Sequence, residues 1–162
     1  MEQLLPLAER ISALLKARNE TIAVAESSAG GLISAALLAV PGASAYFVGG
    51  GVVYTRRALL ALTQVSEDAL SGVKPGTEGA ALLRARVMRE RLSTTWGVSE
   101  SGTAGPAGSR YGYPPGHTSV GVSGPMDAAK IITTGSDDRL ANMYAFAAAA
   151  LELLAETLEK RR

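Results

Sequence analysis

The spacing of apolar residues predicts a helix at each end of the chain. Leucine and isoleucine recur every three or four positions over residues 4–15, which is the period of an amphipathic helix, and charged residues lie off that face. Asn19 marks the end of this first helix. An alanine- and leucine-rich stretch that starts at Asp137 and Asp138 predicts a long final helix, which runs to about residue 159.

Five shorter apolar runs lack this period and predict strands. The second run reads YFVGGGVVY, and its three glycines predict either a bulged strand or two short strands joined by a loop. Gly124 and Pro125 separate the last two runs and predict a hairpin. The five runs are residues 22–25, 46–54, 96–99, 117–123 and 128–134.

Four further helices are predicted between these strands, with Ser66 and Thr77 as N-caps of the third and fourth. Four arginines lie along the last of them, and we expect them to form a solvated face. The predicted helices are residues 32–38, 56–62, 66–70 and 78–93, and the arginines are Arg84, Arg86, Arg89 and Arg91.

Helices and strands alternate along most of the chain, and a hairpin follows. This order predicts an α/β fold, namely a three-layer α/β/α sandwich with a mixed central sheet. We expect residues 1–162 to form a single domain, because the chain is long enough for one core and shows no linker or repeat.

Composition narrows the class of protein. With 47% hydrophobic and 19% charged residues, the chain is typical of a folded globular protein, and a net charge of +1 favours no nucleic-acid partner. The absence of cysteine and the single histidine, His117, exclude disulfides, thiolate metal sites and histidine-rich metal sites. No apolar run reaches membrane-helix length and the first ten residues do not resemble a signal peptide, so we expect a cytoplasmic protein without a membrane partner.

The stretch TIAVAESSAGG, residues 21–31, predicts a site because a buried strand ends there and a helix begins. A helix N-terminus offers unpaired N–H groups to a phosphate, a carboxylate or a developing oxyanion. A serine at this place is either a nucleophile or a helix cap. A second glycine-rich stretch, residues 101–116, also follows a predicted strand, so we expect the two loops to face each other across one pocket.

These motifs resemble the CinA C-terminal domain family. AESSAGG is similar to that family's A-E-S-C-T-G-G, SGTAGPAG is similar to S-G-I-A-G-P-x-G, and Asp138-Arg139 is similar to the G-D-R that begins its last helix. The resemblance extends from about residue 4 to residue 154. It implies an enzyme like nicotinamide-nucleotide amidase, which hydrolyses a carboxamide to a carboxylate and ammonia without a metal or other cofactor. It also implies a small-molecule substrate and a possible homodimer.

The resemblance assigns candidate roles to individual residues. Ser27 aligns with the family's nucleophile, and Tyr54 either hydrogen-bonds within the site or is a core tyrosine. Arg139 either binds a substrate phosphate or forms a surface salt bridge with Asp137 or Asp138. Backbone N–H groups of the two loops are candidates to stabilise an oxyanion; they belong to Ser28, Gly30, Gly31, Gly102, Thr103, Ala104 and Gly105.

The sequence departs from the family at the general base. The family has a lysine a few residues after a Tyr-Ser pair, and this chain has Leu59 there, which cannot accept a proton. Two other basic positions of the family are also lost, to Tyr113 and to the Asn142-Met143 pair. Lys74 and His117 are the candidates for a replacement base, although each has an alternative role as an ordinary surface or structural residue.

Three functional hypotheses follow. The first is a nicotinamide-nucleotide amidase in which Ser27 attacks the carboxamide. The second is a catalytically silent family member that binds a nucleotide or a partner. The third is an amidase for a different, less anionic amide, which fits the lost basic positions. A base within reach of the Ser27 hydroxyl would favour an enzyme, whereas apolar side chains around it would favour the silent member.

Overall fold

A computed structural model describes residues 1–161 and contains one five-stranded mixed sheet in the order β2-β1-β3-β4-β5. β1 runs parallel to both β2 and β3, while β4 is antiparallel to β3 and β5 is antiparallel to β4. This is the mixed sheet that the sequence predicts. The strands are β1 (Ile22–Glu26), β2 (Phe47–Val52), β3 (Trp96–Gly102), β4 (His117–Ser123) and β5 (Ala128–Thr133).

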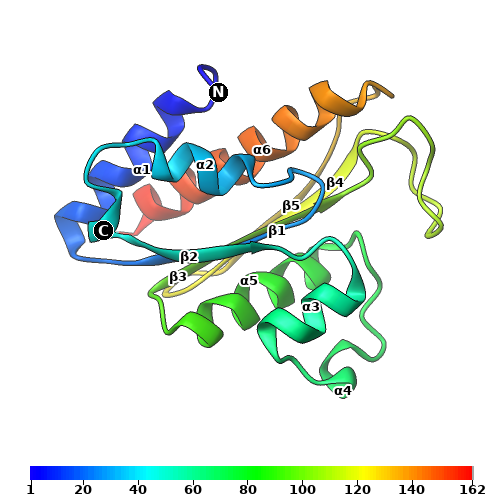
Figure 1. Cartoon of the computed structure of the whole chain (residues 1–162), viewed down its shortest axis with the longest axis horizontal. Coiled ribbons are helices and arrows are strands. Elements are labelled where there is room, and N and C mark those ends of the chain that lie inside the picture. Colours follow the sequence, from blue (N-terminus) through cyan, green and yellow to red (C-terminus); the bar gives the residue numbers. More distant parts are fainter. Residues whose placement is uncertain (162) are drawn as a thin grey trace.

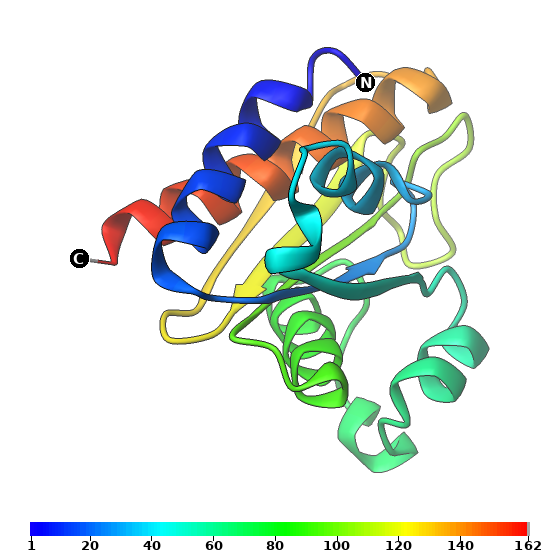
Figure 2. The same ribbon diagram turned by 60° about the vertical axis from the view of Figure 1, so that its left-hand side comes forward.

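Helices cover both faces of this sheet and form the outer two layers of an α/β/α sandwich (Figure 1). One face carries α1 (Leu5–Arg18), α2 (Leu32–Leu38) and α6 (Arg139–Lys160), and α1 and α6 lie side by side (Figure 2). The other face carries α3 (Arg56–Thr63), α4 (Glu67–Leu70) and α5 (Glu78–Leu92). The predicted fold class is therefore confirmed. Among the helices of residues 1–161, none is both long enough and apolar enough to span a bilayer.

The core divides into two parts because side chains of a strand alternate between the faces of the sheet. Val24, Trp96 and Val98 point toward α1, α2 and α6 and belong to the larger hydrophobic cluster. Ala23 and Ala25 point toward the other layer, where they pack with side chains such as Leu59 of α3 and Met88 of α5. The site described below lies on the side of this smaller cluster.

Two glycines allow α5 to pack directly against the sheet. A Cβ atom on Gly97 of β3 would lie 2.1 Å from the carbonyl oxygen of Ala85. A Cβ atom on Gly121 of β4 would lie 2.6 Å from the carbonyl carbon of Ala81. No side chain fits at either strand position, so the glycines set how close the helix and the sheet approach.

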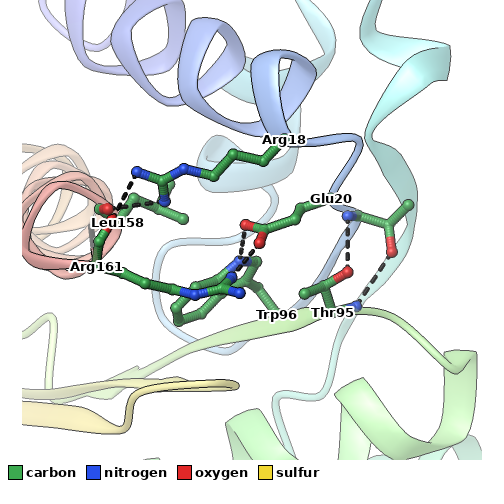
Figure 3. Close-up of polar contacts among 7 residues, drawn as sticks. Arg18, Glu20, Thr95, Trp96, Leu158 and Arg161 are labelled. Carbon is green, nitrogen blue, oxygen red and sulfur yellow. Dashed lines mark hydrogen bonds and ion pairs between the residues drawn. The ribbon is translucent and has the colours of Figure 1, made fainter.

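Polar contacts hold the C-terminal end of α6 to the amino ends of β1 and β3 (Figure 3). Trp96 is fully buried and donates its indole N–H to Glu20, 2.8 Å away, and the same carboxylate accepts a hydrogen bond from Arg161. Arg18 donates to the carbonyl oxygens of Leu158 and Arg161. This end of the sheet is closed by structural contacts, and the loops of the site lie at the opposite end (Figure 1).

The strands differ from the predicted ranges chiefly at their ends. β1 extends to Glu26, β2 covers only Phe47–Val52 of the predicted 46–54, and β5 ends at Thr133. β2 is one continuous strand with a bulge, since its pairing with β1 skips Val48 and then resumes at Gly49. The alternative of two strands joined by a loop is therefore wrong. β3 extends to Gly102 instead of ending at Ser99, because Ser101 and Gly102 pair with β4. Residues 101–102 were expected in the loop, since no apolar pattern identifies them as strand.

Candidate functional site

A cavity of about 410 Å³ lies at the carboxyl ends of β1, β2 and β3, where sites of α/β proteins gather. Its wall is made by the residues that follow these strands, by α3 and α5, and by the loop between β3 and β4. Of the residues considered from the sequence, those that line it are Ser27, Tyr54, Leu59, Arg84, Gly102, Thr103, Tyr113 and His117. The two glycine-rich loops therefore do meet.

The N-terminus of α2, which the sequence suggests as an anion site, is occupied by a carboxylate of the protein itself. Glu26 is fully buried, and its carboxylate accepts hydrogen bonds from the N–H groups of Gly31, Ile33 and Ser34 at 2.8, 3.1 and 2.6 Å. Glu26 does not line the cavity, as expected for a side chain on the opposite face of the strand from Ser27.

A second buried carboxylate, that of Glu100 in β3, holds the turn after β1. It accepts hydrogen bonds from the N–H groups of Ser27 and Ala29 at 3.1 and 2.8 Å, and the Thr118 hydroxyl donates to it at 3.3 Å. Burial raises the pKa of Glu100 to about 7, against the lowering effect of the two backbone hydrogen bonds. Sequence reasoning missed Glu100, for which the only signal is a lone acid inside the strand WGVSESG.

Most N–H groups of the first loop are consequently engaged. Gly30 donates to the carbonyl oxygen of Ser27, and Gly31 donates to Glu26. In the turn of residues 27–31, within the part of the chain that the structure describes, the Ser28 N–H alone has no protein acceptor. Of the oxyanion donors expected in this loop, the N–H groups of Gly30 and Gly31 are therefore occupied, and only that of Ser28 remains.

The two adjacent serines have different surroundings. Ser27 is 6% exposed and lines the cavity, and its hydroxyl has no hydrogen-bond partner among residues 1–161. Ser28 does not line the cavity, and its hydroxyl donates to the carbonyl oxygen of Gly102 and accepts from the Gly102 N–H. Ser28 thus joins the two glycine-rich loops, while Ser27 is free to meet a ligand.

Within residues 1–161, neither candidate base is hydrogen-bonded to Ser27. His117 lines the cavity, but its Nε2 lies 2.9 Å from the Gly76 carbonyl oxygen and its ring stacks on Tyr113 with a 4.0 Å centroid separation. Lys74 is exposed, with its Nζ 5.1 Å from the centroid of the Tyr113 ring, and it does not line the cavity. Both side chains have other contacts in the structure.

Apolar side chains line the part of the cavity that Leu59 belongs to. Leu59 is 3% exposed and packs in the smaller hydrophobic cluster. Leu70 and Leu83 of that cluster also line the cavity, and so do the apolar Val73 and Ala80. A proton released by Ser27 has no acceptor side chain at hydrogen-bond distance within residues 1–161.

Tyr54 lines the cavity and contacts Arg139, which lies outside the cavity wall. Tyr54 is 57% exposed, so the alternative of a core tyrosine is wrong. Arg139 donates to the Tyr54 hydroxyl at 3.3 Å and to the Gly105 carbonyl oxygen at 2.7 Å. Arg139 forms no ion pair with Asp137 or Asp138 in the described structure, so its expected surface salt bridge is also wrong.

The second loop is anchored from behind by Asn142 of α6. This side chain is 1% exposed and donates to the carbonyl oxygens of Ala104 and Ser136 at 2.9 and 2.8 Å. The Thr103 N–H donates to the His117 carbonyl oxygen at 2.7 Å. Thr103 itself lines the cavity. Ala104 and Gly105 lie outside that wall, and so do Gly30 and Gly31.

Arg84 of α5 lines the cavity, contrary to the prediction that the arginines of this helix form a solvated face. We expected a solvated arginine, but Arg84 is half-buried, lines the cavity and donates to the Val53 carbonyl oxygen at 3.2 Å. Burial lowers the pKa of its guanidinium. Helical spacing was the available signal, since Arg84 lies three and four positions after the buried Ala81 and Ala80. Arg86, by contrast, is exposed as expected.

Acidic and histidine side chains of the described residues do not gather into a metal site. In residues 1–161, no three of them are arranged so that they could hold a metal ion.

Sequence comparisons agree on one family. The family model described as the CinA C-terminal domain matches residues 4–158. A "CinA-like protein" from Cyanothece sp. is 41% identical over 119 residues, which cover 74% of this chain and 28% of that protein. A "CinA-like protein" from Chloroherpeton thalassium is 37% identical over 159 residues, covering 95% of this chain and 38% of that protein. The chain thus spans about a third of the length of these curated relatives.

Solved structures agree on the fold. A competence-damaged protein (CinA) superfamily protein from Klebsiella pneumoniae superposes with a TM-score of 0.88 at 23% identity, covering 97% of this chain and 98% of that one. A competence/damage inducible protein from Agrobacterium tumefaciens superposes with a TM-score of 0.84 at 27% identity, covering 96% of this chain and 95% of that one.

Proposed function

Because the chain belongs to the CinA C-terminal domain family, we propose that its cavity binds a nicotinamide nucleotide or a related aromatic amide without hydrolysing it. One observation carries this proposal. Ser27 lies in the wall of the cavity, but among residues 1–161 no side chain able to accept its hydroxyl proton is bonded to it.

The character of the cavity wall supports binding. Tyr111, Tyr113 and His117 supply aromatic surface, and the apolar side chains around Leu59 supply a dry wall for a flat ring. Small-molecule sites are typically mostly apolar with a few directed polar groups. The free Ser27 hydroxyl is such a polar group at the end of β1.

The missing base argues against turnover. Serine is a weak nucleophile at neutral pH and needs a neighbour that takes its proton. At the place where the family resemblance requires lysine, Leu59 is buried among apolar residues. Arginine is no substitute, since a guanidinium remains protonated in proteins; this applies to Arg84 and to Arg56, which is paired with Glu67.

Nicotinamide-nucleotide amidase activity is the second candidate, and the free Ser27 hydroxyl favours it. In that reaction the Ser27 hydroxyl oxygen would attack the carboxamide carbon, and the new oxyanion would accept a hydrogen bond from the Ser28 N–H. The proton of the Ser27 hydroxyl would pass to the amide nitrogen, so that ammonia leaves, and water would then hydrolyse the acyl-serine ester to the acid and regenerate the Ser27 hydroxyl. An amide with less negative charge than a nucleotide is a variant of the same candidate.

We also propose that residues 1–162 form a single domain, that the protein is a homodimer and that it is located in the cytoplasm.

Calorimetric titration of the full chain with nicotinamide mononucleotide tests the proposed function. We expect saturable heat with a Kd of about 1 μM to 1 mM, the range in which enzymes hold their substrates. Unchanged nucleotide recovered after the titration would agree with binding alone. The absence of binding would contradict the proposal, whereas ammonia release that Ser27→Ala abolishes would establish the second candidate.

A further inference from the structure

We propose that Arg84 makes the cavity a receptor for an oxyanion, so that the ligand carries a carboxylate or phosphate that pairs with this guanidinium. The inference rests on the proposed function in that it concerns the same cavity. It adds the chemical class of ligand and names the residue that selects it.

Arg84 has unused hydrogen-bonding capacity. A guanidinium has five N–H donors, and the structure accounts for one bond, from Nη1 to the Val53 carbonyl oxygen at 3.2 Å. No carboxylate within residues 1–161 forms an ion pair with Arg84. A partly buried cation without a counter-ion is costly, and a bound anion would offset that cost.

The acids near Arg84 do not supply that counter-ion. Glu100 is close enough to act electrostatically on Arg84, and the Tyr111 hydroxyl acts in the same sense. However, the oxygens of Glu100 already accept bonds from Ser27, Ala29 and the Thr118 hydroxyl. The remaining donors of Arg84 are therefore available to a ligand in the cavity that this residue lines.

The other two arginines of the cavity wall are weaker anion sites. The Arg56 side chain is 53% exposed and is already paired with Glu67. Arg110 donates to the Tyr111 hydroxyl at 2.9 Å, and its guanidinium lies 5.1 Å from the centroid of that ring. Because solvent screens exposed pairs, an anion gains most beside the half-buried Arg84.

The surroundings of Arg84 indicate the shape of the ligand. Leu83 and Ala80 precede it on α5, and both line the cavity together with Leu59. The guanidinium is a planar fork that binds a carboxylate or a phosphate through two parallel hydrogen bonds. A flat apolar body with an oxyanion at one end fits this combination.

Matched acid and amide probes test the proposal. We would titrate the wild type, Arg84→Gln and Arg91→Gln with nicotinate, nicotinamide, inorganic phosphate and nicotinamide mononucleotide. Arg91 is an exposed residue of the same helix outside the cavity wall, so its variant is the matched control. We expect wild type and Arg91→Gln to bind nicotinate at least tenfold more tightly than nicotinamide, and Arg84→Gln to lose that preference.

The probes separate failure of this inference from failure of the proposed function. Mononucleotide binding of equal strength in wild type and Arg84→Gln would overturn the inference and leave the proposed function intact. Phosphate binding that depends on Arg84, without mononucleotide binding, would support the inference and contradict the proposed function. Comparison of phosphate with nicotinate also identifies which oxyanion the site accepts. If Arg84→Gln does not fold, the wild type alone decides, because equal affinity for nicotinate and nicotinamide would overturn the inference.

Discussion

Among single residues, Glu100 has an environment far from that of a free carboxyl group. It is fully buried at the centre of the sheet, close to a second buried acid, Glu26, whose charge also raises the Glu100 pKa. The N–H groups of Ser27 and Ala29 stabilise its charged form. Their effect is smaller than that of burial, so the Glu100 pKa lies near 7.

This pKa makes stability depend on pH. Between the unfolded value of 4.5 and the folded value of about 7, the native protein binds more protons than the unfolded chain. The free energy of unfolding should therefore rise as pH falls from about 7 to 4.5, by on the order of 3 kcal/mol, and that gain is lost as pH rises through 7. Urea denaturation from pH 5 to 8 measures the slope.

Substitution assigns that slope to one residue. Glu100→Gln keeps the shape of the side chain without its charge, so its stability should vary much less over this pH range. Glu152→Gln, which removes an exposed acid of α6, should keep the slope of the wild type. An equal slope in Glu100→Gln and wild type would show that another group titrates.

At the scale of elements, α2 depends on a residue outside itself. Seven residues are too few for a stable isolated helix, and its N-cap Gly31 has a φ of 102° and provides no side-chain cap. Glu26, the last residue of β1, supplies the cap by accepting three N–H bonds of the first turn. Strand, turn and helix are therefore coupled, and Ser27 lies within this unit.

Removing the cap should weaken the protein. Glu26→Ala leaves three N–H groups of the first turn without an acceptor, one of them buried and two part-buried, so we expect the free energy of unfolding to fall by about 2–4 kcal/mol. Glu26→Gln keeps one acceptor oxygen and should lose less. Glu9→Ala, at an exposed position of α1, is the control. Denaturation midpoints measure the effect, and a loss in Glu26→Ala no greater than in the control would contradict the capping role.

At the scale of the whole molecule, the pattern of apolar residues was enough to predict the layers and the meeting of the two loops. Periods of two and 3.6 residues reflect which face of an element is buried, and that information is local. The end of β3 was missed because Ser101 and Gly102 are held by pairing with β4, which is a long-range contact.

The site was predicted only in part, for the same reason. The position of Ser27 in the cavity follows from the local strand-to-turn sequence, so it could be predicted from neighbouring residues alone. The roles of Arg84 and Glu100 depend on which element packs above each of them. The sequence alone predicts a solvated face for the arginines of α5. Arg84 reaches the cavity only because α5 packs on the sheet beside the ends of the strands. The failure of Lys74 and His117 to reach Ser27 is likewise a result of packing.

Ammonia release from nicotinamide mononucleotide tests most directly whether the missing base silences this site. Leu59→Lys would place a lysine in the apolar wall, where burial depresses the pKa of an amine and suits it to act as a base. We expect no release from wild type, and release from Leu59→Lys that disappears when Ser27→Ala is added. Release from the wild type that Ser27→Ala abolishes would contradict the account, because it would show that Ser27 already has a base.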